Sequence, residues 1–161
     1  MKAATKPSRV PSADPEEQLR SFIDKFDEKN QAVICAARKV LRKRLAGANE
    51  IVYDNYNFFV IGYSPSERPS DTICSIAAGA NGVGLSFYRG ATLPDPHKIL
   101  LGSGTQNRFV RLQSAAMLTR PEVEELIAAA IAQSRVPLQG HGPRKLIIRS
   151  ISGKQRPRRK A

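Results

Sequence analysis

The densest cluster of polar and aromatic side chains in the sequence is VYDNYNF, at residues 52–58. Phenol, carboxylate and carboxamide groups placed this closely can hydrogen-bond a small molecule while the aromatic rings cover its apolar part. The stretch FYR at 87–89 offers further rings and a cation. The candidate ligand-binding residues are therefore Tyr53, Asp54, Tyr56, Asn57, Phe87 and Arg89. The alternative is a break between strands, in which Asp54 or Asn55 hydrogen-bonds nearby backbone groups.

Basic side chains are concentrated at the two ends of the chain. The sequence has 26 lysines and arginines against 14 acidic residues, and eight of the basic residues follow Gly142 while three precede Asp14. The candidate nucleic-acid-binding residues are Lys154, Arg156, Arg158, Arg159 and Lys160. Their charges can bind phosphates by releasing counterions, but no aromatic residue is interleaved with them for stacking on bases. Such binding would be independent of base sequence, and the alternative is a tail that only aids solubility.

The stretch GSGT at 102–105 follows an apolar run and precedes two arginines, so it could cradle a phosphate. It lacks the Gly-x-x-x-x-Gly-Lys-Ser/Thr pattern of phosphate-binding loops, and no glycine-rich motif opens a helix here. We therefore expect Gly102 and Gly104 to turn the chain with positive φ angles. Anion binding is the alternative.

Catalytic groups are not assembled in any recognisable pattern. His97 follows the turn-forming LPDP, and His141 lies among glycines and prolines. Neither histidine belongs to a known combination of nucleophile, base and carboxylate. Cys35 and Cys74 are expected to be reduced and buried, because two cysteines and two distant histidines do not suggest a zinc site. The sequence favours a protein that binds rather than catalyses.

Three helices are predicted from apolar spacing and capping residues. The capping signature DPEE at 14–17 predicts a helix over 15–28. A second helix is expected over 30–46, and its basic stretch RKVLRKR is interpreted as a solvated face. A third is predicted in LTRPEVEELIAAAIAQS, with Thr119 as the N-cap.

Strands are predicted between the second and third helices, where β-branched and aromatic residues alternate with polar ones. EIVYDNYNFFVIGY indicates one interrupted strand or two short ones, and DTICSIAAG, VGLSFYRG and NRFVRLQS indicate one strand each. RKLIIRSIS is either a further strand or an extended arm. This order predicts a two-layer α+β fold, in which an antiparallel sheet of about four to five strands is covered by helices on one face.

The length of 161 residues fits one domain. We expect a disordered N-terminal arm at 1–13, an α+β domain at 14–136, and a basic C-terminal arm and tail at 137–161 with a disordered end. No apolar run approaches the ~20 residues that a membrane-spanning helix needs, and the N-terminus lacks the apolar segment of a secretory signal. A cytoplasmic location without membrane contact is the expectation.

Several stretches resemble the YdhG-like family of small bacterial domains of unknown function. They are EIVYDNYNFFVIGYSPSERPSDTICSIA, YRGATLPDPHKILLGSGTQNRFVRL and the closing helix. The most specific part is the pattern GxxLPDPxxxLxGSGxxxRxxRL, from Gly90 to Leu112. The resemblance covers about residues 19–134 and implies an α+β fold. At 53–56 this chain has YDNY where the commoner family pattern is YGMP.

Some members of that family are described as intracellular iron chaperones similar to frataxin, so the resemblance makes iron a candidate ligand. Iron prefers hard oxygen ligands. The first predicted helix offers Glu17, Asp24 and Glu28 roughly on one face, and these are the candidate metal ligands. Basic residues are interleaved with them, and the alternative is a solvated helix face.

The expected function is that of a non-catalytic accessory protein that binds a small ligand or a metal ion, with an iron-chaperone role implied by the resemblance. The alternative is a nucleic-acid-associated protein that acts through its basic C-terminal tail. No motif specifies the ligand or an oligomeric state.

Overall fold

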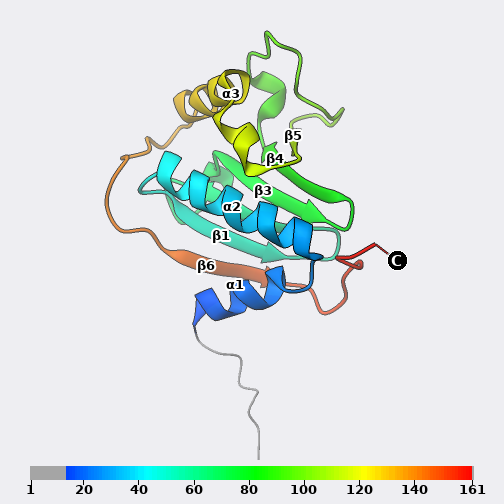
Figure 1. Ribbon diagram of the computed structural model, residues 1–161. Helices are drawn as coiled ribbons and strands as arrows, with labels where there is room; N and C mark the ends of the chain where they lie inside the picture. The colour runs from blue at the N-terminus through cyan, green and yellow to red at the C-terminus, as the bar shows by residue number, and fades with distance from the viewer. Residues whose placement is uncertain (1–13, 161) are drawn as a thin grey trace, which may run out of the picture.

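The computed structural model describes residues 14–160 and contains one six-stranded sheet with three α-helices (Figure 1). The strand order across the sheet is β5-β4-β3-β2-β1-β6. The predicted α+β fold is confirmed, with one strand more than the four to five expected. The arm predicted at 1–13 lies outside the described residues.

Five strands form an antiparallel meander: β1 (Asn49–Asp54), β2 (Phe59–Ser64), β3 (Cys74–Gly79), β4 (Gly82–Phe87) and β5 (Arg108–Leu112). Residues 55–58 turn between β1 and β2, and the Asn55 N–H donates to the Phe58 carbonyl at 3.0 Å. The stretch EIVYDNYNFFVIGY therefore forms two strands. The tight turn places the polar residues that follow Asp54 at one end of the sheet.

The sixth strand, β6 (Leu146–Ile151), pairs with β1 in parallel. Leu146 and Ile148 pack against the core, so β6 belongs to the same hydrophobic unit as the strands before it. The segment is thus a strand of the sheet and not an arm that begins after residue 136. Only the tertiary fold places it there, because a parallel pair requires a long crossover rather than a hairpin.

The three helices are α1 (Pro15–Ile23), α2 (Glu28–Arg44) and α3 (Pro121–Ala132). The helix predicted over 15–28 stops at Ile23, because the Asp27 carboxylate accepts a hydrogen bond from the Asn30 N–H at 2.8 Å and starts a new helix. Phe26, in the turn between them, is completely buried. None of the helices within 14–160 is both long and apolar enough to cross a membrane.

The N-cap predicted for the third helix is wrong. Thr119 ends a short 3-10 turn, Ala115–Thr119, and its hydroxyl donates to the Ala116 carbonyl at 2.9 Å. Arg120 occupies the N-cap position instead, without a side-chain cap. Pro121 at the first helical position fits the start of α3 in either case.

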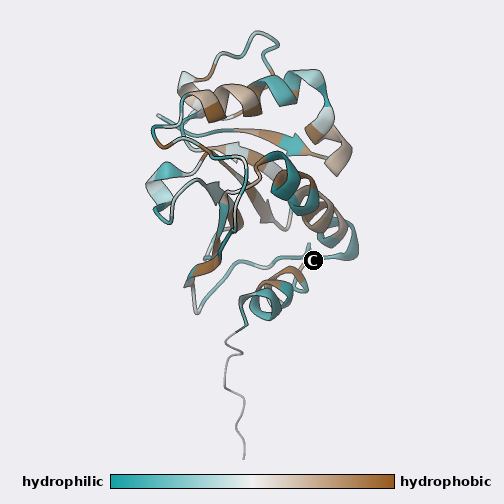
Figure 2. Ribbon diagram, turned by 90° about the vertical axis from the view of Figure 1, so that its left-hand side faces the viewer, coloured by the Kyte–Doolittle hydropathy of each residue, from teal (hydrophilic) through white to brown (hydrophobic). Residues whose placement is uncertain are grey.

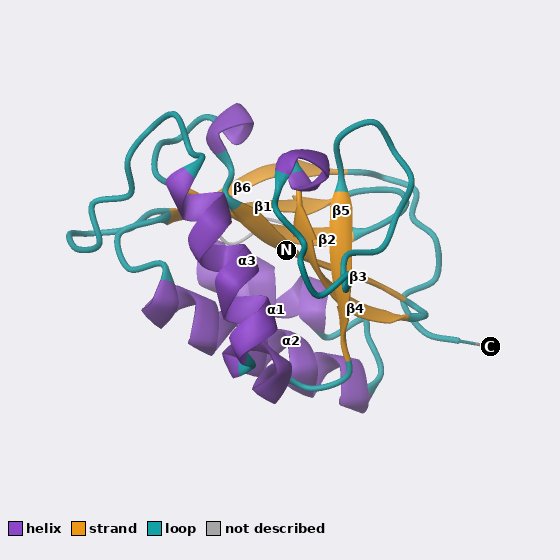
Figure 3. Cartoon of the chain, turned by 90° about the horizontal axis from the view of Figure 1, so that it is seen from above, coloured by secondary structure: helices purple, strands orange, loops and turns teal. Residues whose placement is uncertain are grey.

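The helices cover one face of the sheet, and no α-helix within the described residues lies on the other face (Figure 3). Alternate strand residues point to the helix side, where they join helix residues in one core. The Phe59 ring of β2 illustrates the contact, because its centroid lies 6.3 and 5.9 Å from those of Phe22 and Phe26. Hydrophilic residues make up much of α1 and α2, whereas α3 consists mostly of apolar residues (Figure 2).

Candidate functional site

The predicted ligand-binding residues do not form one pocket. Tyr53 and Asp54 end β1, whereas Phe87 ends β4, which runs in the opposite direction. The two groups therefore lie at opposite ends of the sheet, separated also by three strand spacings of about 4.8 Å. Phe87 faces the helices and is only 1% exposed, while Tyr53 points to the opposite face.

The last described residues, 152–160, fold back over the Asp54 end of β1; we call this segment the C-terminal latch. Arg158 Nη2 lies 2.9 Å from Asp54 Oδ1 and also donates to the Asn55 carbonyl at 2.6 Å. Lys25 Nζ, from the turn after α1, lies 2.7 Å from Asp54 Oδ2. The Asp54 side chain is fully buried and that of Arg158 is 2% exposed.

The remaining latch residues occupy the polar groups that the sequence assigned to a small ligand. The Gln155 side-chain amide donates to the Asp54 carbonyl at 2.7 Å. The Arg156 N–H donates to the Tyr56 carbonyl, its Nε donates to Asn57 Oδ1 at 2.8 Å, and its guanidinium lies 5.6 Å from the Tyr56 ring centroid. Asp54, Tyr56 and Asn57 thus bind the C-terminal end of the chain itself.

Electrostatics favour this arrangement. Burial raises the pKa of Asp54, but hydrogen bonds from Lys25, Gln155 and Arg158 outweigh burial and hold that pKa below its ordinary value. The Arg158 guanidinium also lies 6.0 Å from the Phe26 ring centroid, a cation–π distance. Its Nε and Nη1 atoms are buried without a hydrogen-bond partner among the described residues. The carboxylate of Asp54 is therefore the main anchor of the latch.

The expectation of a disordered basic tail is wrong up to Lys160. Arg158 cannot contact a nucleic acid in this structure, because its side chain is buried against Asp54. Arg159 is exposed, but its Nε donates to the Lys25 carbonyl at 3.2 Å. Lys154 and Lys160 remain exposed. Part of the positive charge of the latch stabilises the fold, because Arg158 pairs with the buried Asp54. Counting charges in the sequence could not reveal this role.

The candidate metal ligands do not share a helix face. Glu17 lies on α1, Asp24 caps its C-terminus, and Glu28 opens α2 after a turn. Among residues 14–160, no group of three or more His, Cys, Asp or Glu side chains is placed to hold a metal ion. The one-face prediction is wrong because it assumed a continuous helix from 15 to 28.

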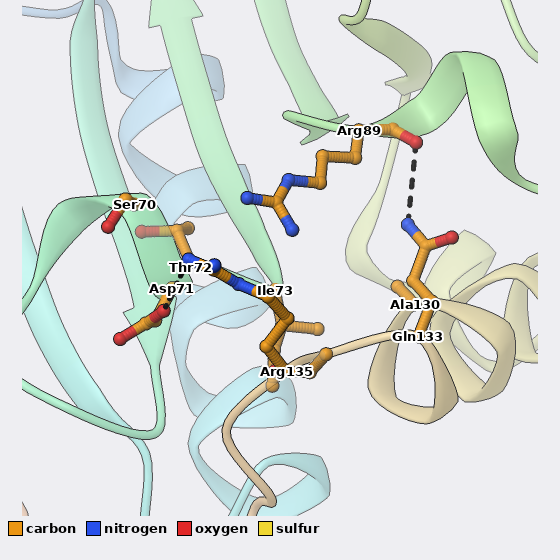
Figure 4. Close-up of a pocket in the computed structure, with 9 residues that line it drawn as sticks. Ser70, Asp71, Thr72, Ile73, Arg89, Ala130, Gln133 and Arg135 are labelled. Carbon is orange, nitrogen blue, oxygen red and sulfur yellow. Dashed lines mark hydrogen bonds and ion pairs between the residues drawn. The ribbon is translucent and has the colours of Figure 1, made fainter.

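Arg89 lines a small cavity between η1 (Pro69–Asp71) and the end of α3 (Figure 4). The cavity holds about 20 Å³, which is room for one water molecule. The Gln133 side chain donates to the Arg89 carbonyl at 3.4 Å, and Arg135 Nη2 lies 3.8 Å from Asp71 Oδ1. This cavity is too small for an organic ligand.

A larger, open depression lies on the outer side of α2, where it meets the chain that leads into β6. Its lining residues are Cys35, Arg38, Lys39, Arg42, Lys43 and Arg144. Five of the six are cationic, and none of the described lining residues is acidic. Arg144 is held in place because its Nη2 donates to the Arg42 carbonyl at 2.7 Å, while its buried Nη1 has no partner among the described residues. We call this surface the basic depression.

The buried Glu50 carboxylate neutralises two of these cations, Arg38 and Arg42. Arg38 donates to both oxygens of the buried Glu50 carboxylate, at 2.9 and 3.0 Å, and Arg42 Nε lies 3.6 Å from Glu50 Oε1. Arg38 also forms a bidentate pair with Glu16. Lys39 and Lys43 are exposed and have no ion pair with other described residues. They, together with Arg144, leave an excess of positive charge open to solvent.

The basic depression was missed at the level of sequence. The stretch RKVLRKR was interpreted as a solvated face, and Arg144 was counted with the C-terminal charges. Their meeting depends on the parallel pairing of β6 with β1, which brings residue 144 beside α2. The only sequence signal available was the spacing of Arg38, Lys39, Arg42 and Lys43 at helical intervals.

The loop at 102–105 has a structural role. Gly102 has φ +110°, as predicted, whereas Gly104 is not among the residues with positive φ. The Leu101 and Phe109 backbones exchange two hydrogen bonds, so the loop is tied to β5. Arg108 Nη1 donates to the Gly104 carbonyl at 2.6 Å, which keeps that arginine within the loop.

The two cysteines differ in accessibility. Cys74 is buried as predicted, whereas Cys35 is exposed at the basic depression, contrary to the prediction. Burial raises the pKa of the Cys74 thiol to about 12. We therefore expect a neutral maleimide to label one thiol per native molecule and two after denaturation, as counted by mass spectrometry. Cys35→Ser should abolish native labelling, and persistent labelling of that variant would contradict the assignment.

Comparison of the chain with protein-family models, with curated proteins and with solved structures finds no match. The described geometry offers a basic depression on α2, a small cavity at Arg89 and a latch anchored on Asp54.

Proposed function

We propose that the protein is a non-catalytic, nucleic-acid-associated protein that contacts phosphate backbones through the basic depression. The observation that supports this most directly is the lining itself, in which five cationic side chains and no described acidic one surround an open surface. Lys39 and Lys43 have no competing ion pair with described residues, and the hydrogen bond from Arg144 Nη2 to the Arg42 carbonyl holds that arginine beside them. Phosphate oxygens are the acceptors that such a surface binds best.

Binding of this kind gains free energy from the release of condensed counterions and does not discriminate between base sequences. The net formal charge of +12 adds a long-range attraction for polyanions. The proposal differs from binding through the C-terminal tail, because Arg158 is committed to the latch. A small-ligand or metal role has no comparable support from the cavities and carboxylates among residues 14–160.

The test is the salt dependence of binding to a fluorescent DNA duplex of about 20 base pairs. The double variant Lys39→Gln/Lys43→Gln should lower the slope of log affinity against log salt by about 1.8, because each lost phosphate contact contributes about 0.9. Both side chains are exposed and unpaired among the described residues, so the fold should be unaffected.

The matched control is Arg68→Gln/Lys98→Gln, which removes the same charge from two other exposed positions. Its slope should stay close to that of the unmodified protein. A second readout is the thiol of Cys35, which lines the depression and should react more slowly with maleimide when the duplex is bound. Equal slopes for both double variants, or an unprotected Cys35, would overturn the proposal.

A further inference from the structure

The sheet face that points away from the helices has an ordered pattern of side chains. One row across five strands is Tyr53, Val60, Ala77, Gly84 and Arg111, and the next is Ile51, Gly62, Ser75, Ser86 and Phe109. The central strands β2, β3 and β4 thus carry small side chains, while larger ones stand on β1 and β5. Among residues 14–160, no α-helix covers this face (Figure 3), although Ile51 and Gly62 are buried and the Thr72 side chain would lie 3.3 Å from a Cβ at Gly62. We call it the open face.

Aromatic rings stand at both sides of the open face. Phe58, just before β2, is 54% exposed, and a Cβ placed at Gly79 would lie 3.5 Å from its ring. Phe109 lies on β5, and a Cβ at Gly84 would come within 3.8 Å of its ring. Tyr53 points outward from β1 and is partly exposed. Phe58 is the more accessible ring, because Phe109 is only partly exposed and also lies beside Gly102, where a Cβ would be 3.6 Å from its ring.

The charge of the open face is positive. Arg111, exposed on β5, has its guanidinium 5.7 Å from the Phe109 ring centroid. Arg149 of β6 is also exposed and lies at the register shift between the Val52–Ile148 and Tyr53–Ser150 pairs, next to Tyr53. None of the outward-facing residues on the six described strands is acidic. Aromatic rings paired with arginines and free of carboxylates are the chemistry that binds the bases and phosphates of single strands.

We propose that the open face binds single-stranded nucleic acid, with bases stacked on Phe58 and Phe109 and phosphates held by Arg111 and Arg149. This inference rests on the proposed function and adds a preference for unpaired bases. Tyr53 and Arg111 are separated by four strand spacings, about 19 Å, which accommodates several consecutive nucleotides. A second copy of the chain is a poorer occupant, because two faces of the same positive charge repel each other.

The experiment compares a labelled single strand of about ten nucleotides with the duplex of the same sequence. Phe58→Leu and Phe109→Leu should each weaken single-strand binding about tenfold, since a stacked base contributes about that factor. Duplex affinity should be unchanged. Phe58→Tyr and Phe109→Tyr should retain single-strand affinity, which a role in packing alone would not explain. The control Tyr56→Leu removes an exposed ring that lies under Arg156 of the latch.

A fluorescence readout tests the same contact directly. The sequence contains no tryptophan, so Phe109→Trp introduces a single reporter whose emission should be quenched by the single strand and not by the duplex. Unchanged single-strand affinity of both leucine variants, or equal losses for single strand and duplex, would overturn the inference. A dimer that Phe109→Leu converts to a monomer, without change in strand affinity, would also overturn it.

The two proposals fail separately. If Lys39→Gln/Lys43→Gln leaves duplex binding unchanged while the leucine variants weaken single-strand binding, the open face is the binding surface and the basic depression is not. If only Lys39→Gln/Lys43→Gln weakens nucleic-acid binding, the basic depression is the binding surface and the open face is not. Absence of binding to either ligand overturns both.

Discussion

Arg158→Met is expected to lower the free energy of unfolding by about 3 kcal/mol, because it leaves a fully buried carboxylate with one partner fewer. Arg158 Nη2 donates to Asp54 Oδ1 and to the Asn55 carbonyl, and only Lys25 would still pair with Asp54. Methionine keeps most of the apolar stem that packs near Phe26, so the loss reports the polar contacts. Urea unfolding followed by circular dichroism measures the change.

The matched control for this prediction is Lys154→Ala, in the same latch. Lys154 is exposed and has no hydrogen bond or ion pair with other described residues, so its removal should change stability by less than about 0.5 kcal/mol. Asp54→Ala/Arg158→Met should lose less than the sum of the two single variants, since removing both partners leaves no unpaired charge between them. Additive losses would show that the two side chains do not interact.

The ion pair between Asp54 and Arg158 also predicts that the free energy of unfolding depends on pH. The pKa of Asp54 is lower in the folded protein than its ordinary value near 4. A group with a depressed folded pKa stabilises the fold above its unfolded pKa, and that contribution is lost as the pH falls through the folded value. The stability difference between the unmodified protein and Asp54→Asn should therefore be constant from about pH 5 to pH 7 and should shrink below about pH 4. A difference that grows at low pH would contradict this.

Glu50→Ala is expected to cost about 3–5 kcal/mol of stability, because it removes the shared acceptor of a buried cluster. The Glu50 carboxylate accepts from Arg38 and from the Tyr63 hydroxyl at 2.9 Å, and the Glu50 and Tyr63 residues are completely buried. Burial raises the pKa of Tyr63, so its hydroxyl stays a donor. Although burial disfavours its charge, hydrogen bonds to Glu50 and Glu16 raise the pKa of Arg38 above its ordinary value, so it stays charged. In the variant the Tyr63 hydroxyl would lose its acceptor, and Arg38 would keep only the half-exposed Glu16.

Glu16→Ala is the control, because Glu16 pairs with the same arginine at the surface. Its side chain is 48% exposed, and surface pairs contribute about 0–1 kcal/mol. The loss of stability caused by Tyr63→Phe should fall between those of Glu50→Ala and Glu16→Ala, at about 1–3 kcal/mol, because it removes one buried hydrogen bond. Thermal unfolding of all three variants gives the order. Equal effects for Glu50→Ala and Glu16→Ala would show that the buried position of Glu50 contributes nothing.

Much of the fold could be predicted from local patterns. The capping residue Asp14 and the alternation in β3 and β4 act over a few residues, so they can be recognised without a structure. The early end of α1 could not be recognised in this way. Asp27 competes with the continuing helix as a cap, and the burial of Phe26 decides the competition.

The candidate sites depended far more on the tertiary structure. Tyr53 and Phe87 looked like parts of one pocket because both are aromatic strand residues, but strand direction places them at opposite ends. Asp54 looked like a ligand-binding carboxylate, and it binds Arg158 instead. Each error has the same origin, since residue type states what a side chain can bind and not which residue reaches it.

The sequence by itself determined the α+β class, the presence of three helices and the excess of positive charge, because periodicity and composition are local or additive properties. The tertiary structure alone decided that β6 joins the sheet beside β1, that the latch neutralises Asp54, and that Arg144 meets the cations of α2. These pairs are about 100 residues apart in the chain. No local pattern encodes such contacts, because they form only when the core has brought the distant segments together.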